Sequence, residues 1–160
     1  MLPTSPSNHF LELKIPPPIA AVVVGFIMGC LARISPPQDV PALARFWIAP
    51  AIALIGVAFT ASGAIAFRRA RTTTNPTKPG AASSLVSSGP YGITRNPMYV
   101  GLALILAAWA VFLWSAWALV GPVAFIAYMR RFQIAPEERA LSALFGAEYR
   151  AYRARVRRWL

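Results

Sequence analysis

The sequence contains few of the residues from which proteins build disulfides or metal centres. It has one cysteine, Cys30, and one histidine, His9, among 160 residues. A single cysteine cannot form an internal disulfide, and two scattered ligands do not make a metal site. These shortages exclude a disulfide-stabilised domain and a protein-ligated zinc centre. Cys30 lies inside an apolar run, which is typical of a buried thiol.

Acidic residues are also scarce, with 5 Asp and Glu against 16 Lys and Arg and a net charge of +11. Only 13% of the residues are charged and 57% are hydrophobic, whereas about 25% are charged in a typical soluble domain. Most basic residues lie between or after apolar blocks. This pattern predicts an integral membrane protein that contacts anionic lipid headgroups. It argues against a nucleic-acid-binding protein, whose charge gathers on a soluble face.

Three apolar blocks predict the transmembrane helices. They cover Ile19–Ile34, Phe46–Phe67 and Met98–Met129. As one helix the third block would measure about 48 Å, which exceeds a hydrocarbon core of about 30 Å. We therefore expect a short helical hairpin with its turn at Trp114–Ser115, and Gly121–Pro122 should kink its second helix or tighten its packing. The sequence predicts an all-α membrane fold with about four transmembrane helices and a C-terminal amphipathic cytoplasmic helix.

The chain is expected to form one domain. Residues 1–18, which end in three prolines, are predicted to be a flexible leader, and residues 19–160 a single membrane-embedded domain. The basic residues flanking the third block predict a plasma or inner membrane topology with both termini cytoplasmic. These residues are Arg68, Arg69, Arg71, Lys78 and Arg95 before the block, and Arg130 and Arg131 after it.

The segment Gly89–Gly101 reads Gly-Pro-Tyr-Gly-Ile-Thr-Arg-Asn-Pro-Met-Tyr-Val-Gly and directly precedes the third apolar block. Asn96 followed by Pro97 is typical of a helix N-cap and first helical position. Free backbone amides at that helix start, next to Arg95, would form an anion-binding site. Alternatively, Arg95 is only a cytoplasmic anchor of the membrane protein.

A helix beginning at Pro136 carries two adjacent carboxylates. Glu137 and Glu138 flank a predicted apolar stripe, on which Glu148 also falls. Carboxylates directed toward an apolar face need a partner, either a cationic ligand or a facing arginine. In the simpler interpretation they only complement the helix dipole. The stripe comprises Leu141, Leu144, Phe145, Tyr149, Tyr152, Val156 and Trp159, and the opposite face carries Arg139, Arg150, Arg153 and Arg157.

These two clusters resemble the signatures of a membrane methyltransferase family that includes isoprenylcysteine carboxyl methyltransferases and phospholipid methyltransferases. Its G-x-Y…R-H-P-x-Y-x-G signature is similar to Gly89-Pro90-Tyr91, Arg95-Asn96-Pro97-Met98-Tyr99 and Gly101. Its E-E-x-x-L…F-G-x-x-Y-x-x-Y ending is similar to Glu137-Glu138, Leu141, Phe145-Gly146, Glu148-Tyr149 and Tyr152. The loop at Thr74–Pro76 is similar to the polar stretch before the signature. The resemblance covers about residues 45–159.

The resemblance implies S-adenosylmethionine as methyl donor, bound on the cytoplasmic side by a part of the chain spanning about residues 68–159. It implies a lipid or lipophilic acceptor that enters from the bilayer. Arg95 would hold a carboxylate, and Glu137 or Glu138 would pair with a cationic centre of the cofactor. Arg95 and Glu138 are the implied catalytic residues. The implied cofactor-binding residues are Gly89, Tyr91, Arg95, Asn96, Pro97, Tyr99, Gly101, Glu137, Glu138 and Tyr149.

Asn96 departs from this signature, which has histidine at that position. Asparagine hydrogen-bonds but is not a base at neutral pH, so the acceptor atom cannot be carried over from the family. Two alternatives remain. A membrane reductase of the steroid-reductase type would use NADPH, whose phosphates the two glutamates would repel. A non-catalytic membrane protein would pair those glutamates only with Arg95 or Arg130.

Overall fold

The computed structural model describes residues 12–34, 39–71 and 82–160, and these residues form helices and connecting turns without a β-strand. The predicted all-α fold is therefore confirmed. The main helices are α1 (Pro17–Arg33), α2 (Ala49–Arg69), α3 (Pro97–Leu113), α4 (Val120–Tyr128) and α5 (Ala135–Arg155). Shorter elements are the π-helical turns η1 (Ala44–Ile48) and η5 (Met129–Ile134) and the 3₁₀ turns η3 (Gly89–Gly92) and η4 (Ala116–Leu119).

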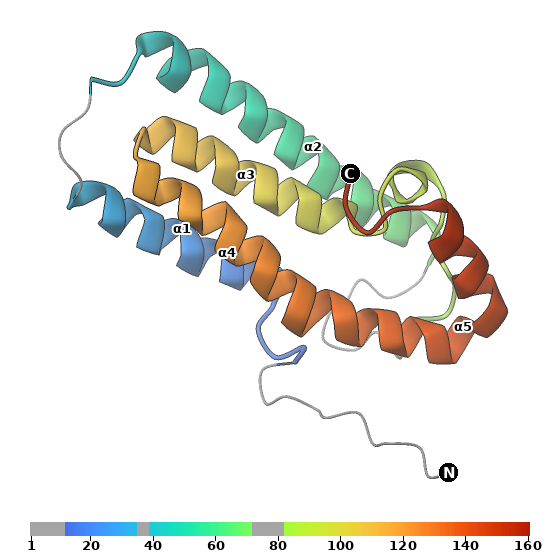
Figure 1. Cartoon of the computed structure of the whole chain (residues 1–160). Coiled ribbons are helices and arrows are strands. Elements are labelled where there is room, and N and C mark those ends of the chain that lie inside the picture. The colour runs from blue at the N-terminus through green and yellow to red at the C-terminus, as the bar shows by residue number, and fades with distance from the viewer. Residues whose placement is uncertain (1–11, 35–38, 72–81) are drawn as a thin grey trace.

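Helices α1 to α4 lie side by side as a bundle, and α5 extends beyond it and bends back (Figure 1). Helix α3 is the centre of this bundle because it packs against α1, α2 and α4. The main core cluster contains buried side chains from all of these helices except α2. Its members are Ala20, Met28, Tyr99, Leu106, Ala110, Ala118, Phe125, Met129 and Ile134.

The predicted hairpin turn is confirmed. Helix α3 ends at Leu113, Trp114 adopts a left-handed backbone with φ 51°, and Ser115 is extended. A Cβ atom at Gly121 would overlap the Met28 side chain. Of the two roles predicted for Gly121–Pro122, the structure therefore supports close packing, here of α4 against α1.

Helix α3 packs even more closely against α2. A Cβ atom at Gly101 would overlap the Thr60 hydroxyl and the Gly56 carbonyl of α2. Because only glycine leaves room for this backbone approach, Gly101 has a packing role that is sufficient to explain its place in the signature. The α2–α3 contact fixes where the residues before α3 lie.

The predicted separate helix beginning at Pro136 is wrong in one respect, because η5 joins α4 to α5 without a break. Proline lacks a backbone N–H and its ring clashes with the carbonyl four residues earlier. A wider π turn just before it relieves that clash. The same arrangement recurs at η1, which directly precedes α2 and its Pro50. Helix α5 is thus a polar continuation of an apolar helix.

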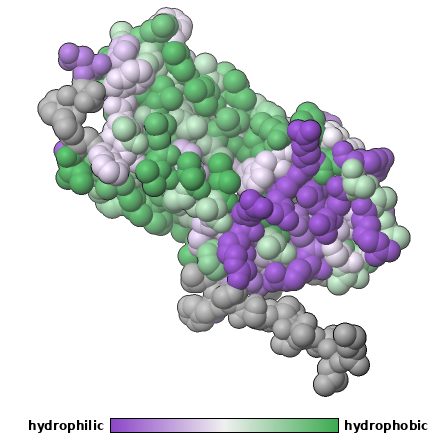
Figure 2. Space-filling model, viewed as in Figure 1, coloured by the Kyte–Doolittle hydropathy of each residue, from purple (hydrophilic) through white to green (hydrophobic). Residues whose placement is uncertain are grey.

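Among the residues that the structure describes, one helix, Ala44–Arg69, is long and apolar enough to cross a membrane, with a mean hydropathy of 2.0 over its best window. Helices α1 and α3 are apolar but have 17 residues each. Large apolar side chains are exposed on α1 (Ile19, Val22, Val23, Phe26, Ile27) and α2 (Leu54, Ile55, Val57, Ile65). Figure 2 shows that the visible bundle surface is largely hydrophobic whereas the α5 end is hydrophilic. Cys30 is exposed on α1, so its predicted burial is wrong.

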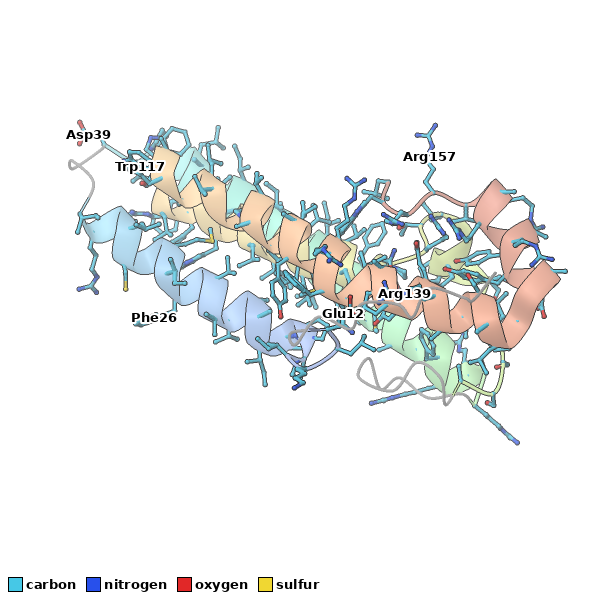
Figure 3. All side chains as sticks on the ribbon, turned by 60° about the horizontal axis from the view of Figure 1, so that its bottom comes forward. Glu12, Phe26, Asp39, Trp117, Arg139 and Arg157 are labelled. Atoms are coloured by element: carbon cyan, nitrogen blue, oxygen red, sulfur yellow. The ribbon has the colours of Figure 1, made fainter. Side chains whose placement is uncertain are left out.

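Helix α1 begins at Pro17, inside the segment predicted as a leader. The residues just before it are attached to η5. Glu12 forms an ion pair with Arg139 (Figure 3) and another with Arg131. The Leu13 N–H donates to the Phe132 carbonyl at 3.1 Å. The rest of the predicted leader, residues 1–11, and the loop at Thr74–Pro76 lie outside the described residues.

Candidate functional site

The predicted signature residues meet where α3 begins. The turn η3 brings Tyr91 into a buried position, and Gly89 permits this turn because its φ is +61°. The Tyr91 ring contacts Phe67 at the end of α2, with ring centroids 5.2 Å apart. The Tyr91 carbonyl accepts a hydrogen bond from the Tyr152 hydroxyl of α5 at 2.8 Å. The hydrogen bond between Tyr152 and Tyr91 thus connects the two signature segments, one before α3 and one on α5. We call this meeting of η3, the start of α3 and α5 the junction.

Asn96 occupies the predicted N-cap position of α3, and Pro97 is the first helical residue. The Asn96 side chain makes no capping hydrogen bond to α3, and its Nδ2 donates to the Arg158 carbonyl at 2.9 Å. The N–H groups of Tyr99 and Val100 both donate to the Asn96 carbonyl at 3.0 Å. Fewer backbone amides are therefore available for an anion than the sequence predicted.

Arg95 and Glu138 come together as an ion pair with an Nη1–Oε1 distance of 3.1 Å. Each side chain is only 11% exposed. Glu138 also accepts hydrogen bonds from Nε and Nη2 of Arg158, so two guanidinium groups share one carboxylate. Arg95 Nε is buried and donates no hydrogen bond to any residue that the structure describes. This N–H is a ready donor for an anionic group, since a buried donor without a partner is costly.

Glu137 has a different environment from Glu138. Its Oε1 accepts hydrogen bonds from the Tyr99 hydroxyl at 2.6 Å and from Gln133 Nε2 at 2.8 Å. Within the described ranges it forms no ion pair with a basic residue. Burial raises the pKa of Glu137 to about 7, while the hydrogen bonds from Tyr99 and Gln133 oppose this rise and the Glu138 charge adds to it. Among the described residues, Glu137 therefore has no cationic partner, and a cationic group of a ligand would supply one.

Tyrosine side chains surround this carboxylate pair. Burial is the main cause that raises the pKa values of Tyr91, Tyr149 and Tyr152, so all three hydroxyls stay neutral. Glu137 adds to the rise at Tyr91, and Glu138 adds to it at Tyr149. Tyr149 and Tyr152 pack with Val156 in a second apolar cluster. Tyr91 and Tyr149 therefore contribute neutral hydroxyls and aromatic faces, whereas the Tyr152 hydroxyl already donates to the Tyr91 carbonyl.

Two details of the predicted α5 stripe are wrong. Glu148 is exposed, as is Leu144, so neither belongs to the buried face. The stripe was projected on an unbroken helix, but Gly146 has φ 45° and ψ −112° and breaks the helical path. Helix α5 also ends at Arg155, and Trp159 beyond it packs against the main core. Glu148 therefore faces solvent and is not part of the junction that contains Glu137 and Glu138.

The sequence interpretation missed three residues of the junction. Gln133 lies four residues before Glu137, and this helical spacing was a usable signal for their hydrogen bond. Thr94 is completely buried, and its hydroxyl donates to the Arg158 carbonyl at 3.2 Å. Arg158 lies beyond the end of α5, where periodicity carries no information, and it resembled other C-terminal arginines. The part of the chain that the structure describes holds no group of three or more potential metal ligands.

Comparison with known proteins connects this geometry to a family. A family model described as phospholipid methyltransferase matches residues 44–148. This range includes the residues before α3 and the Glu137–Glu138 pair but stops short of Arg158. The chain is also similar to an uncharacterised protein of Haemophilus influenzae, with 49% identity over 63 residues, which are 39% of this chain and all of that protein. No solved structure matches significantly. The family model matches more than half of this chain, so the chain belongs to the phospholipid methyltransferase family.

Proposed function

We propose that this protein transfers a methyl group from S-adenosylmethionine to a lipophilic acceptor at the cytoplasmic face of a membrane. Membership of a phospholipid methyltransferase family supports methyl transfer to a lipid-like substrate. One observation carries the proposal further. Among the described residues, the Glu137 carboxylate in the junction has no cationic partner, and the next residue, Glu138, pairs with a buried arginine that has an unused donor, Arg95.

The chemistry of the cofactor fits these two groups. S-adenosylmethionine carries one carboxylate and two cationic centres, an ammonium and a sulfonium. Arg95 Nε would bind the carboxylate, because its buried N–H has no partner in the described part of the chain. Glu137 would pair with a cationic centre, because its present partners Tyr99 and Gln133 are neutral. When bound, the cofactor supplies a methyl group activated by a positively charged sulfur.

The remaining proposed residues act by shaping this site. Glu138 holds the Arg95 guanidinium, and Tyr99 orients the Glu137 carboxylate. Asn96 and Pro97 set the start of α3, whereas Gly101 holds α3 against α2. Gly89, Tyr91 and Tyr149 would line the cofactor site on the η3 and α5 sides. The protein thereby contributes alignment and exclusion of water, which are the main demands of direct methyl transfer.

The position of the junction suits a lipid acceptor. Exposed apolar side chains cover the bundle, and hydrophilic residues cover the α5 end (Figure 2). In a membrane, this contrast would place the bundle in the hydrocarbon and the junction at its aqueous boundary. A lipid would then reach the junction from the bilayer while the cofactor entered from water. The basic residues near the junction would lie on the cytoplasmic side.

Transfer of a labelled methyl group tests this proposal. Purified protein is incubated with S-adenosylmethionine labelled in its methyl group and with vesicles of mixed bacterial lipids, and label is measured in the organic extract. We expect label to enter the lipid fraction with wild type and to fall at least about tenfold in Glu137→Gln, because a charge-assisted contact is lost. Glu148→Gln is the matched control, since Glu148 is exposed on the same helix. Equal transfer by wild type and Glu137→Gln would contradict the proposed role of Glu137.

A further inference from the structure

The five residues Val156–Leu160, which we call the strap, return from α5 to the start of α3. Helix α5 ends because Val156 adopts an extended backbone with φ −117° and ψ 132°. The break at Gly146 bends the second half of α5 back toward the bundle (Figure 1). Its φ of 45° is a conformation that glycine adopts without a Cβ clash. The polypeptide therefore doubles back over the signature segment.

Backbone and side-chain hydrogen bonds attach the strap to residues 94–96. The Arg95 N–H donates to the Arg157 carbonyl at 2.8 Å. The Arg158 carbonyl accepts from Asn96 Nδ2 at 2.9 Å and from the Thr94 hydroxyl at 3.2 Å. Asn96 is the position at which this chain departs from the family signature, and here its carboxamide is committed to the strap.

Apolar contacts hold both ends of the strap. Val156 is buried with Tyr149 and Tyr152 in the second cluster. Trp159 packs against the main core, which contains Tyr99. Apolar packing thus fixes the strap on either side of Arg158 in the sequence, so this residue is held at a defined place.

That central residue, Arg158, binds Glu138 with two donors. Nε donates to Oε1 at 3.0 Å and Nη2 donates to Oε2. This fork geometry fixes the carboxylate plane in a way that a single donor does not. Arg95 Nη1 pairs with the same Oε1 atom of Glu138 at 3.1 Å. The hydrogen bonds from Arg158 to Glu138 also raise the pKa of Arg158, so its positive charge is secure.

From this arrangement we infer that the strap completes the cofactor site and that Arg158 is a positioning residue, which orients Glu138 and through it Arg95. Two guanidinium groups around one carboxylate leave a net positive charge, which favours an anionic group at Arg95. The family match ends at residue 148 and therefore does not account for the strap. The inference rests on the proposed function, since the anionic group is taken to be the carboxylate of S-adenosylmethionine.

The chain offers a matched pair of substitutions for the test. Arg158→Gln removes the guanidinium that binds Glu138. Arg157→Gln makes the same charge change one residue earlier, where the side chain is exposed and projects away from the junction (Figure 3). Asn96→Asp is a third variant of nearly identical shape that loses the donor to the strap carbonyl. All three are compared with wild type in the same detergent.

Two readouts separate closure of the strap from ligand binding. Hydrogen exchange of the Arg95 amide, which donates to the Arg157 carbonyl, reports closure without any ligand. Calorimetry with S-adenosylmethionine reports binding. We expect Arg158→Gln and Asn96→Asp to speed this exchange and to weaken binding by about tenfold or more, while Arg157→Gln stays within about twofold of wild type.

Three results would overturn the inference. These are unchanged exchange in Arg158→Gln, faster exchange with unchanged affinity for S-adenosylmethionine, and equal losses in Arg157→Gln and Arg158→Gln. Absence of binding to wild type would instead contradict the proposed function, because the amide exchange still reports whether Arg158 closes the strap.

Discussion

Different interactions stabilise the bundle and the junction. In the bundle, α3 packs against α2 through small residues such as Gly56 and Gly101, and large apolar side chains remain on the outside. In the junction, polar groups far apart in the sequence bind each other, as Asn96 binds the Arg158 carbonyl. Close packing of complementary shapes stabilises the bundle, and paired hydrogen bonds stabilise the junction. Substitutions should therefore affect the two regions in separable ways.

The largest effect is expected from breaking the bundle. Gly101→Ala adds a Cβ that overlaps Thr60 and Gly56, so we expect a loss of about 3 kcal/mol in the free energy of unfolding. Gly29→Ala in α1 is the control, because its Cβ would lie 4.0 Å from Trp109. Denaturation followed by circular dichroism in detergent measures both. Similar stabilities of the two variants would refute close packing of α2 on α3.

The next largest effect is expected in the junction. Glu138→Gln removes the charge shared by Arg95 and Arg158 and leaves both guanidinium groups without their carboxylate. We expect a loss of about 2 kcal/mol, less than for a fully buried pair because Arg158 is 27% exposed on its side chain. Hydrogen exchange should show the loss in α5 and the residues before α3 but not in α2. If hydrogen exchange instead became equally faster throughout the protein, the bundle and the junction would not be separately stabilised regions.

The pH dependence of stability also distinguishes the two regions, because Glu137, whose pKa is shifted, lies in the junction. The pKa of Glu137 is raised by burial to about 7, so the folded state holds its proton more tightly than the unfolded state does. Stability should therefore fall as pH rises from about 4.5 to about 7, by roughly 1–2 kcal/mol after allowance for partial solvent screening. Melting temperatures across this range measure the effect. Glu137→Gln should lack this component, and an unchanged pH profile in that variant would assign the titration elsewhere.

A single hydroxyl gives the smallest effect. Tyr152→Phe removes the hydrogen bond to the Tyr91 carbonyl and should cost about 1 kcal/mol. Tyr128→Phe in α4 serves as the control, since no hydrogen bond from the Tyr128 hydroxyl is found in the described part of the chain. Chemical denaturation of both variants measures the difference. An equal cost in both variants would mean that the hydroxyl bond contributes nothing specific to the junction.

Apolar blocks were sufficient to predict the bundle helices. The blocks and the length of Met98–Met129 predicted the helices and the turn at Trp114, because long apolar runs leave a strong local signal. The merger of α4 with α5 was missed, since a proline is an ambiguous boundary. A π turn before Pro136 lets the helix continue, and no sequence pattern announces such a turn.

The junction was predictable only in part. The signature placed Arg95 and Glu138 in one site, and the structure brings them into contact. It did not separate the environments of Glu137 and Glu138, because that difference arises from Tyr99, Gln133 and Arg158. Of these, only Gln133 lies at helical spacing from its partner. The strap was missed altogether, since residues beyond a helix end carry no periodicity and their partners are about 60 positions away along the chain.

The most direct test of the central claim is calorimetric titration of detergent-solubilised protein with S-adenosylmethionine and, separately, with NADPH. We predict saturable binding of S-adenosylmethionine, at least about tenfold weaker in Glu137→Gln, and no binding of NADPH, whose phosphates the carboxylate pair would repel. Binding of NADPH without S-adenosylmethionine, or S-adenosylmethionine binding that is indifferent to Glu137→Gln, would contradict a methyl-donor site at the junction.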